Sequence, residues 1–403
     1  MSAPLEGKRI LLGVTGSIAC YKAADLASKL TQAGARVNVL MTEAALQFVT
    51  PLTFQSVTGR RAYTDADLWG SEGHVQHISL GKDADLLLVA PATANTLAKL
   101  AHGLADNLLS VTALAATCPL MVAPAMDGGM FNHSATQANL ETLRQRGAVI
   151  VGPAEGHLAS GLRAVGRMVE PLELLGHVRL LLSRQGPLMG KKVIVTAGGT
   201  QEPLDPVRAI CNRSSGKQGF ALAQAALDLG ADVTLVAAPV SLPVPVGARR
   251  VDVRTAQEML SAVLDALPGA DALIMAAAVA DFHPAEVAAE KIKKAGGAPQ
   301  LRLEPTVDIL KSVERYKEDN GWPRFAVGFA AESIDLLENA RAKLEYKKLD
   351  FIVANDITAV DAGFGVDTNR VTLLYADGRV EALPLMSKAQ VATIVLERLA
   401  ALL

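Results

Sequence analysis

Residues 191–223 read KKVIVTAGGTQEPLDPVRAICNRSSGKQGFALA, and this stretch decides the fold of the half of the chain that contains it. A short apolar run at residues 193–195 meets a glycine pair, a long polar loop follows, and an alanine-rich helix begins near Lys217. The order predicts a strand, a loop and a helix N-terminus rich in hydrogen-bond donors, which is the local arrangement that holds an anion. We therefore expect this half of the chain to act on a phosphate.

Two simpler interpretations of the same stretch have to be weighed. The Walker A pattern GxxxxGK[ST] is absent because Gln218 follows Lys217, so a nucleoside-triphosphate P-loop is not expected. Ser214 and Ser215 could simply cap the helix, which is as common a role as binding. The length of the loop favours binding, since a long loop between strand and helix is uncommon unless it is functional.

Length and composition predict two domains in a cytoplasmic protein. The chain has 403 residues, half of them apolar, and the run SRQGPLMG at residues 183–190 is typical of a linker. The net charge of −2 gives no general affinity for nucleic acid or an anionic membrane. Cysteines at positions 20, 118 and 211 form no CxxC pair, which favours a reducing compartment over disulfides or structural zinc. Neither a signal peptide nor an apolar run of the ~18 residues that span a bilayer is visible.

The first half of the chain predicts a parallel sheet with a ligand crevice. A strand–helix–strand pattern runs from Arg9 to Met41 without a GxGxxG motif, and no acidic residue follows its second strand. NAD is therefore disfavoured, and we expect a mononucleotide phosphate at Ser17 and Thr42. Two further strands end in PATANT (91–96) and PAMDGGM (124–130), which should face the same pocket because carboxyl ends of parallel strands line the crevice.

Two other segments of this half are harder to interpret from the residues alone. His77 lies between these strands, and a lone histidine is more often a surface or capping residue than a catalyst. The glycine-rich residues 157–171, HLASGLRAVGRMVEP, predict a flexible flap.

The second half repeats the strand–helix–strand pattern and ends differently. The strand ALIMAAAVADF (272–282) carries Asp281 and precedes the basic loop EKIKKAGGAP (290–299). A charge run is usually solvated, but here a mobile lid over a polyphosphate is favoured. Lys343 and Lys347 share a helical face and could pair with acids or meet phosphates. Residues 370–385 predict a hairpin around Asp377-Gly378. We therefore expect two Rossmann-like, three-layer α/β domains, the second ending in antiparallel strands.

A series of short motifs connects the two halves. In chain order they are GSIA, PATANT, PAMD, GRM, TAGGTQEPLD, NRSSGKQG, AAAVADF, EKIKK, GFAAE and VAND. Together they resemble the bifunctional phosphopantothenoylcysteine decarboxylase/phosphopantothenate-cysteine ligase family of bacterial coenzyme A synthesis. Each motif alone is weak, but their order over nearly the whole chain is specific. The resemblance implies an FMN-binding decarboxylase domain at residues 1–186 and a CTP-dependent ligase domain at residues 187–403.

For the first domain the resemblance implies a flavin site and three catalytic positions. The implied FMN-binding residues are Gly16, Ser17, Ile18, Thr42, Pro91, Thr93, Asn95, Thr96 and Met126. Flavin oxidation of the substrate's CH2-SH to a thioaldehyde would supply the electron sink that decarboxylation needs. His77 is the implied acid/base, and Asp127 and Ser160 occupy the other two positions.

Two of these positions depart from the family's pattern. Asp127 stands where Asn usually follows PAM, and it would repel a carboxylate unless it is protonated or paired with His77. Ser160 stands where an ACG motif carries a cysteine, and its hydroxyl is a far weaker acid than the thiol that protonates the enethiolate; Cys118 or water could serve instead. An alternative is therefore a ligase on a flavin-binding scaffold that has lost decarboxylation.

For the second domain the resemblance implies amide synthesis in two steps. The carboxylate of 4'-phosphopantothenate attacks the α-phosphate of CTP and releases pyrophosphate, and the amine of cysteine then displaces CMP. Asn212 would hold the acyl intermediate, and Lys291 with Mg2+ would neutralise the phosphates. The implied CTP-binding residues are Met275, Ala276, Ala277, Asp281, Lys291, Val307, Asp308, Ile309, Leu310, Phe329, Lys343 and Lys347. The metal ligands stay unknown.

The implied partners are small molecules and further copies of the chain. The substrates would be 4'-phosphopantothenate, cysteine and CTP, and flavin domains of this type form trimers, often joined into dodecamers. A nicotinamide oxidoreductase built on two nucleotide folds is a third possibility, which the missing ribose-binding acids disfavour.

Overall fold

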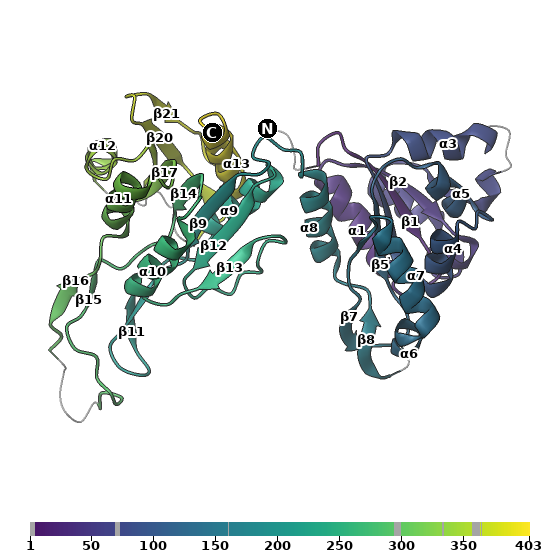
Figure 1. Ribbon diagram of the computed structural model, residues 1–403, viewed down its shortest axis with the longest axis horizontal. Coiled ribbons are helices and arrows are strands. Elements are labelled where there is room, and N and C mark those ends of the chain that lie inside the picture. Colours follow the sequence, from purple (N-terminus) through teal and green to yellow (C-terminus); the bar gives the residue numbers. More distant parts are fainter. Residues whose placement is uncertain are drawn as a thin grey trace. The chain divides into compact units, whose positions relative to one another are not determined.

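The computed structural model describes residues 5–68, 73–159, 161–293, 300–332, 334–356, 363 and 365–403. The chain divides into two compact units, Met1–Leu182 and Ser183–Leu403. Each unit has a mainly parallel sheet with helices on both faces, which confirms the predicted α/β class (Figure 1). Among the described residues, no helix combines the length and apolar character that crossing a bilayer requires.

The sheet of the first unit has the strand order β3-β2-β1-β4-β5-β6, and all its pairs are parallel. Its strands are β1 (Arg9–Val14), β2 (Arg36–Met41), β3 (Ala62–Thr64), β4 (Leu86–Ala92), β5 (Leu120–Pro124) and β6 (Val149–Ile150). Every residue of β4 is buried, as expected for a central strand covered on both faces. The strand order reverses between β1 and β4, and ligands of doubly wound folds bind at that point.

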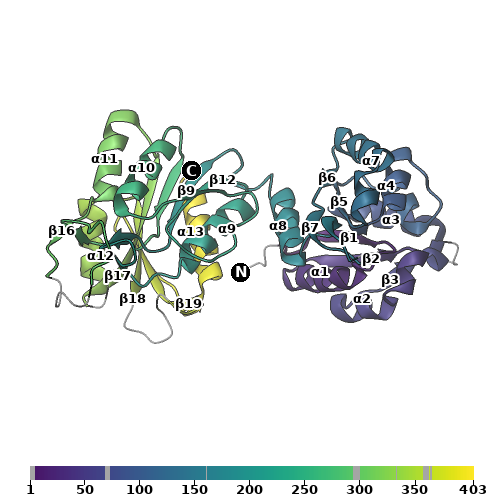
Figure 2. The same ribbon diagram turned by 90° about the horizontal axis from the view of Figure 1, so that it is seen from below.

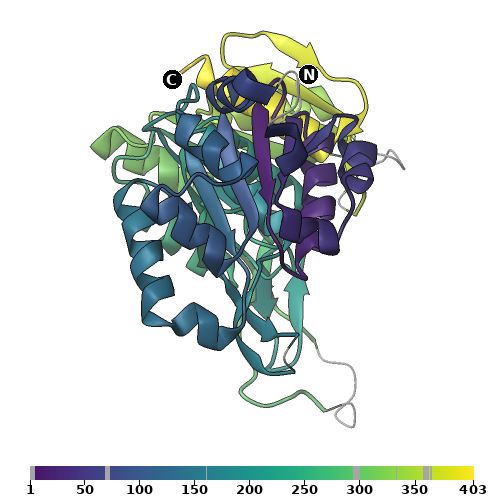
Figure 3. The ribbon, with the colours of Figure 1, turned by 90° about the vertical axis from the view of Figure 1, so that its right-hand side faces the viewer.

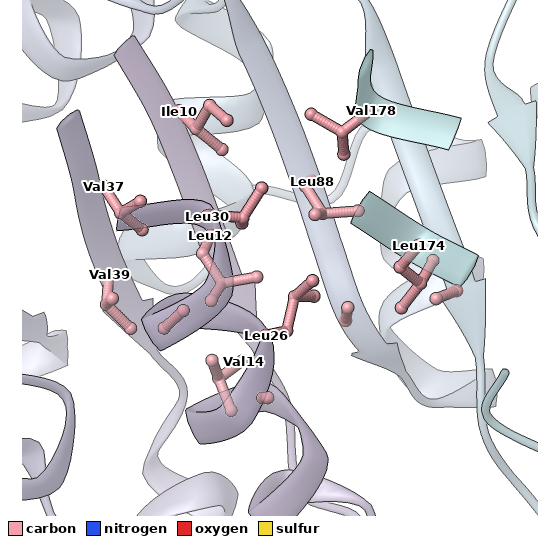
Figure 4. Packing of buried hydrophobic residues seen from close by; sticks show 14 of the residues in the cluster. Ile10, Leu12, Val14, Leu26, Leu30, Val37, Val39, Leu88, Leu174 and Val178 are labelled. Carbon is pink, nitrogen blue, oxygen red and sulfur yellow. The ribbon is translucent and has the colours of Figure 1, made fainter. Parts of the chain in front are cut away.

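Two helical layers cover this sheet. Its helices are α1 (Cys20–Gln32), α2 (Pro51–Thr58), α3 (Gly73–Asp83), α4 (Ala94–His102), α5 (Leu108–Ala115), α6 (Gly128–Asn132), α7 (Ser134–Gln145) and α8 (Pro171–Leu182), with short 3-10 turns η1 (Glu43–Gln47) and η2 (Asp65–Leu68). Leu26 and Leu30 of α1 and Leu174 and Val178 of α8 are spaced four apart, so each pair faces the same core (Figure 4). Helices α4, α5 and α7 pack on the other core, and Figure 3 shows the purple α1 and the blue α7 on opposite sides of the strands.

The segment that the sequence predicts as a flexible flap forms an antiparallel hairpin. Its strands are β7 (Ala154–His157) and β8 (Arg163–Arg167), and β8 lies within the predicted flap. The Gly166 carbonyl accepts a hydrogen bond from Met126 N at 3.0 Å, and a Cβ on Gly166 would lie 2.2 Å from Met126 O. The hairpin is therefore fixed to the turn after β5. Ser160 lies outside the described residues.

The sheet of the second unit has the order β13-β12-β9-β14-β17-β18-β20-β21. Its strands are β9 (Lys192–Ala197), β12 (Asp232–Ala237), β13 (Arg249–Asp252), β14 (Ala272–Met275), β17 (Phe325–Glu332), β18 (Phe351–Asp356), β20 (Val371–Tyr375) and β21 (Val380–Ala382). The pairs are parallel up to β18 and antiparallel beyond it, which confirms the predicted final hairpin. The reversal between β9 and β14 repeats the switch point of the first unit.

Five helices cover this second sheet (Figure 2). They are α9 (Lys217–Asp228), α10 (Ala256–Ala266), α11 (Ile309–Asn320), α12 (Leu336–Tyr346) and α13 (Lys388–Ala400). Helices α9 and α13 pack on each other, while α10, α11 and α12 cover apolar clusters on the opposite face. This placement puts the N-terminus of α9 at the carboxyl end of β9.

Short paired strands replace two segments that the sequence predicts differently. The long polar loop after β9 contains the hairpin β10 (Gln201–Pro203) and β11 (Ala209–Cys211). The predicted strand 272–282 is wrong beyond Met275, because the N–H groups of Ala276 and Ala277 turn to Thr196 Oγ1. Remaining short strands are β15 (Phe282–Pro284), which pairs with β16 (Leu303–Pro305), and β19 (Thr368–Asn369), which pairs with β22 (Met386–Ser387).

Candidate functional site

A cavity of about 530 Å³ lies at the carboxyl end of the second sheet, at the switch point between β9 and β14. It brings together Asn212 and every predicted CTP-binding residue except Lys291. Those lining residues are Met275, Ala276, Ala277, Asp281, Val307, Asp308, Ile309, Leu310, Phe329, Lys343 and Lys347. Lys291 is exposed and lies on the segment that follows β15.

The floor of this cavity is built by hydrogen bonds between the ends of β9 and β14. Thr196 Oγ1 accepts hydrogen bonds from Ala276 N and Ala277 N, both at 3.1 Å, and Thr200 Oγ1 accepts one from Ala280 N at 2.9 Å. Gly219 at the start of α9 approaches closely, since a Cβ there would lie 2.5 Å from Ala197 Cβ. These contacts fix the helix N-terminus beside the turn after β14.

The start of α9 is capped by a glycine and not by a serine. Gly216 is the N-cap residue, with φ +72°, so the alternative in which Ser214 and Ser215 simply cap the helix is wrong. Ser214 Oγ accepts a hydrogen bond from Gly216 N at 3.4 Å, and both serines line the cavity. The positive end of the helix macrodipole therefore faces the cavity together with two hydroxyl groups.

Charged side chains surround the cavity in paired arrangements. Lys347 Nζ lies 3.3 Å from Asp308 Oδ1, so of its two predicted roles it adopts the ion pair in this structure. Lys217 Nζ donates to Asp367 Oδ1 at 2.6 Å, and this hydrogen bond lowers the pKa of Asp367. Lys388 is buried, and desolvation, followed by repulsion from Lys217, lowers its pKa.

Two asparagines present their amides to the cavity. Asn212 Nδ2 donates to the carbonyl of Val279 at 2.9 Å, which fixes its orientation. Asn355, at the end of β18, is only 8% exposed, and its Oδ1 is buried with no hydrogen-bond partner. Sequence reasoning did not single out Asn355 as a site residue, although it belongs to the VAND motif and is the first polar residue after a run of apolar strand residues.

The first unit holds a second cavity of about 630 Å³ beside the start of α1. The predicted residues that line it are Gly16, Ser17, Ile18, Thr93, Met126 and Asp127. Those that do not are Thr42, Pro91, Asn95, Thr96 and His77. Tyr21, Phe48 and Met130 also line it, and they are 61%, 48% and 52% exposed, so an apolar rim surrounds its opening.

The turn between β1 and α1 forms a closely packed cradle beside the end of β2. A Cβ on Gly16 would lie 2.5 Å from Ala44 Cβ, so the backbone of this turn contacts the segment after β2. Thr42, at the end of β2, has a buried Oγ1 without a hydrogen-bond partner. A phosphate group would supply the missing acceptor, since it has several oxygen atoms. Thr15 Oγ1 accepts from Thr93 N at 3.1 Å and thereby ties the PATANT segment to this turn.

Asp127 and Lys22 fix the other side of this cavity. Asp127 is the N-cap of α6 and accepts a hydrogen bond from Gly129 N at 2.9 Å, a role that Asp and Asn fill equally well. Lys22 is buried, and its Nζ donates to the carbonyl of Met168 at 2.8 Å and to Glu170 Oε1 at 2.9 Å. Sequence reasoning missed Lys22, which looks like an ordinary polar residue on an amphipathic helix.

His77 is separated from the other predicted decarboxylase residues. It lies on α3, and Figures 1 and 2 show α3 at the opposite end of this unit from the β7–β8 hairpin. Its Nδ1 is buried, and within the described part of the chain His77 has no hydrogen-bond or ion-pair partner. The pairing of His77 with Asp127 that sequence analysis considered is therefore absent within one chain.

Comparisons with known proteins agree with this architecture. A flavoprotein family model matches residues 1–181, and the family model of the DNA/pantothenate metabolism flavoprotein C-terminal domain matches residues 188–403. Over 401 residues the chain is 47% identical to the coenzyme A biosynthesis bifunctional protein CoaBC of Bacillus subtilis, covering 99% of this chain and 98% of that protein. The chain belongs to the CoaBC family.

Other CoaBC relatives show similar coverage. The CoaBC protein of Mycobacterium tuberculosis (strain ATCC 25618 / H37Rv) is 46% identical over 398 residues, covering 96% of this chain and 94% of that protein. A solved structure of the C-terminal domain of a CoaBC protein is 38% identical and covers 54% of this chain and 98% of that chain, with a TM-score of 0.46.

Membership of the CoaBC family defines the general activity. The chain is a bifunctional flavoprotein enzyme of coenzyme A biosynthesis with decarboxylase and ligase activities. The family resemblance predicted from the motifs is therefore confirmed. Because the chain matches bifunctional relatives over nearly its full length, the alternative of a ligase on an inactive scaffold is not favoured.

Proposed function

We propose that residues 187–403 join cysteine to 4'-phosphopantothenate with CTP, and that residues 1–186 decarboxylate the product to 4'-phosphopantetheine. The observation that carries this proposal is the cavity at the switch point of the second sheet. Its lining includes the N-terminus of α9, Asn212 and nearly all residues that the family resemblance implies for CTP. No other described cavity combines a helix N-terminus with these motifs.

In the ligase reaction the protein would position 4'-phosphopantothenate and CTP, which are both anions, and stabilise the negative charge of their phosphates. The N-terminus of α9 and the backbone at Ala276-Ala277 supply donors for phosphate oxygens. Asn212, oriented by Val279, would hold the acyl oxygen of the acyl-cytidylate while the amine of cysteine attacks. Phe329 offers an apolar contact for the base, and the unpartnered Oδ1 of Asn355 can accept a hydrogen bond from the nucleotide.

Magnesium would reach this site with the nucleotide. Mg2+ commonly uses one or two carboxylates together with substrate phosphates, so a preformed cluster of ligands is not needed. The described residues contain no group of three His, Cys, Asp or Glu residues that could hold a metal. Asp281 and Asp308 are the carboxylates among the described residues that line the cavity.

The first unit fits FMN at the cradle described above. Gly16, Ser17 and Thr42 would hold the phosphate, and the orphaned Thr42 hydroxyl supports this fit. Thr93, Asn95, Thr96 and the Pro91 turn would border the ring. When bound, FMN supplies reversible two-electron oxidation of the substrate's thiol carbon.

The decarboxylase residues would come from more than one copy of the chain. Asp127 lines the cavity, whereas His77 does not, and α3 lies at the opposite end of this unit from α6 (Figure 1). An apolar rim of exposed Ile18, Tyr21 and Met130 favours a partner subunit over solvent at the opening. We infer a cytoplasmic, trimer-based assembly in which the partner's α3 brings its histidine to this rim.

A single reaction mixture tests the proposed function. Purified protein is incubated with CTP, cysteine, 4'-phosphopantothenate and Mg2+, and the products are separated and weighed by mass spectrometry. We expect CMP, pyrophosphate, carbon dioxide and 4'-phosphopantetheine, together with flavin absorbance near ~450 nm. A colourless protein that leaves CTP unchanged would remove both halves of the proposal, whereas CMP without carbon dioxide would remove only the decarboxylase half.

A further inference from the structure

Asp205 is a buried carboxylate that lies outside both cavities. It occupies the turn between β10 and β11, and its side chain is fully buried. Its Oδ1 accepts hydrogen bonds from Val207 N and Arg208 N, both at 2.8 Å. Burial opposes its ionisation, but the hydrogen bonds from Val207, Ile292 and Arg208 are stronger in sum and lower its pKa. Asp205 is therefore an anion held in place by donors.

The second oxygen of Asp205 contacts a distant segment of the chain. Oδ2 accepts hydrogen bonds from Arg208 Nη1 at 2.8 Å and from Ile292 N at 3.2 Å. Arg208 Nη1 also donates to the carbonyl of Ile292 at 3.0 Å, so both backbone groups of Ile292 are bound by this pair. Nearby, Ala288 N donates to the carbonyl of Leu204 at 3.0 Å. The turn thus holds the segment from residue 288 to residue 292 at both of its ends.

The hairpin that carries Asp205 also carries Asn212. Strand β11 ends at Cys211, and Asn212 follows it directly into the ligase cavity, where Val279 fixes its amide. At the other end of the same hairpin, the Asp205 turn fixes Ile292, the residue after Lys291. One short hairpin therefore sets the positions of two segments that bear predicted catalytic residues.

We propose that Asp205 is a positioning residue of the ligase, which through Arg208 and the backbone of Ile292 holds Lys291 at the distance from Asn212 that the phosphates of CTP require. The proposal rests on the proposed role of Lys291 at the triphosphate. The two carboxylate oxygen atoms of Asp205 have different partners. Oδ1 accepts hydrogen bonds within the local turn, and Oδ2 accepts one from Ile292 N in the distant segment.

Asp377 shows that an aspartate can stabilise a turn without a hydrogen bond like the one between Asp205 Oδ2 and Ile292 N. In the β20–β21 turn, Asp377 Oδ1 accepts from Arg379 N at 3.0 Å and Oδ2 accepts from Arg379 Nε at 2.7 Å. The local pairing of Asp with a nearby Arg resembles that at Asp205, but Asp377 is exposed and, within the described part of the chain, contacts no distant segment. A buried, paired charge is rarely favoured for stability alone, so the deeper site at Asp205 suits a positional role.

The substitution Asp205→Asn separates these two functions. Asn can keep Oδ1 for the turn, but it places an N–H group against the donors of Arg208 and Ile292. We expect CTP to bind about tenfold more weakly, since a hydrogen bond to a charged group is lost, with unchanged flavin content. Asp377→Asn is the matched control and should bind CTP like the unsubstituted protein.

A double-mutant cycle with Lys291→Gln distinguishes positioning from general damage. Isothermal titration calorimetry measures CTP binding to the full-length flavin-loaded protein and to each variant. If Asp205 acts through Lys291, the double variant binds CTP no more weakly than Lys291→Gln alone. Additive losses, or normal binding by Asp205→Asn, would overturn the proposal. Normal binding by Lys291→Gln would remove the role of Lys291 and this inference with it, while leaving CTP turnover by the unsubstituted protein intact.

Hydrogen exchange provides a second measurement that does not depend on catalysis. In Asp205→Asn, the peptide that contains Ile292 should exchange faster, while the peptides of β10 and β11 keep their protection. Arg208→Gln, which removes the donor to the Ile292 carbonyl, should show the same pattern if Asp205→Asn does not fold. Unchanged exchange at Ile292 in both variants would contradict the proposal.

Discussion

Asn212 shows how a single hydrogen bond can orient a reactive site. Its amide donates to the carbonyl of Val279 at 2.9 Å, a backbone group on the turn that also lines the cavity. The bond leaves Oδ1 and the second amide hydrogen for a ligand. A residue with the same shape but without donors would lose this orientation.

The substitution Asn212→Asp therefore should abolish amide synthesis. The new carboxylate cannot donate to Val279, and its charge repels the phosphates, so we expect CMP release to fall about 10²-fold or more. The measurement is CMP release by chromatography, with flavin absorbance as the check on folding. Asn320→Asp is a matched control, because Asn320 also donates to a backbone carbonyl, that of Tyr316 at 3.0 Å, but on a surface helix. Unchanged CMP release by Asn212→Asp would exclude the proposed role.

At the scale of single elements, glycines decide how closely the segments around the first cavity approach. Gly166 in β8 lies against the Met126 backbone, and a Cβ there would be 2.2 Å from Met126 O. Gly129 in α6, which lies nearby, has room, since its nearest neighbour would be its own turn's Asp127 Oδ1 at 3.4 Å. An added methyl group would therefore clash with the backbone at Gly166 but make an ordinary contact at Gly129.

We expect Gly166→Ala to loosen the β7–β8 hairpin and to reduce flavin binding. Overpacking of this kind costs roughly 1–3 kcal/mol, and it should lower both the flavin content and the rate of carbon dioxide release. Ligase activity should persist, because the cavity of the second unit is built from other elements. Flavin absorbance per mole of protein and CMP release are the two measurements. The same losses in Gly129→Ala would show that steric contact with Met126 is not the cause.

The hairpin β20–β21 depends on an ion pair with the last helix. Glu381 accepts hydrogen bonds from Arg398 Nη2 at 2.7 Å, Arg398 Nε at 3.0 Å and Tyr375 Oη at 3.0 Å. The Arg398 hydrogen bond lowers the pKa of Glu381, and burial raises the pKa of Tyr375 to about 12. The lowered pKa of Glu381 means that its contribution to stability is present above pH ~4.5 and is lost as the pH falls through its folded-state pKa.

Glu381→Gln should therefore destabilise the protein at neutral pH but not at low pH. The expected loss at pH 7 is roughly 0.5–1 kcal/mol, since the pair is partly exposed. Urea unfolding at pH 7 and at pH 3, followed by circular dichroism, compares the variant with the unsubstituted protein. An equal loss of unfolding free energy at both pH values would show that packing, not charge, explains the effect.

The sequence predicted the long strands and helices well and the short paired strands poorly. The strand–helix–strand pattern predicted from Arg9 to Met41 matches β1, α1 and β2, because each element follows a clear apolar pattern. Strands β10 and β11 were missed, since three-residue strands such as Gln201–Pro203 have no periodicity to detect. The predicted strand 272–282 failed beyond Met275 because a side chain, Thr196, takes the backbone N–H groups that a ladder would use.

At the scale of the whole molecule, the motifs predicted most residues that line the second unit's cavity. They did not predict which chain of the proposed assembly supplies each decarboxylase residue. The nucleotide motifs meet within one unit because they follow the carboxyl ends of neighbouring parallel strands. His77, the implied acid/base, lies away from the cavity that Asp127 lines, on α3. Sequence order contains no signal for contacts between copies, so this separation becomes visible only in three dimensions.

Subunit complementation tests whether the histidine acts on a neighbouring copy. We expect His77→Asn and Asp127→Ala to be inactive as decarboxylases when each is purified alone. When the two variants are expressed together, some sites combine the partner's intact histidine with an intact Asp127. Random mixing restores about a quarter of the sites, because each of the two residues is intact with a probability of one half.

The measurement is carbon dioxide release per flavin from the mixed assembly, with CMP release as the internal reference. Mixing the proteins after purification provides the control, since assemblies that do not exchange subunits should stay inactive. Recovery of about a quarter of the normal rate on co-expression would require that each site is built by two chains. No recovery would mean that His77 reaches the site of its own chain, which α3 could do only by leaving its packed position against α5.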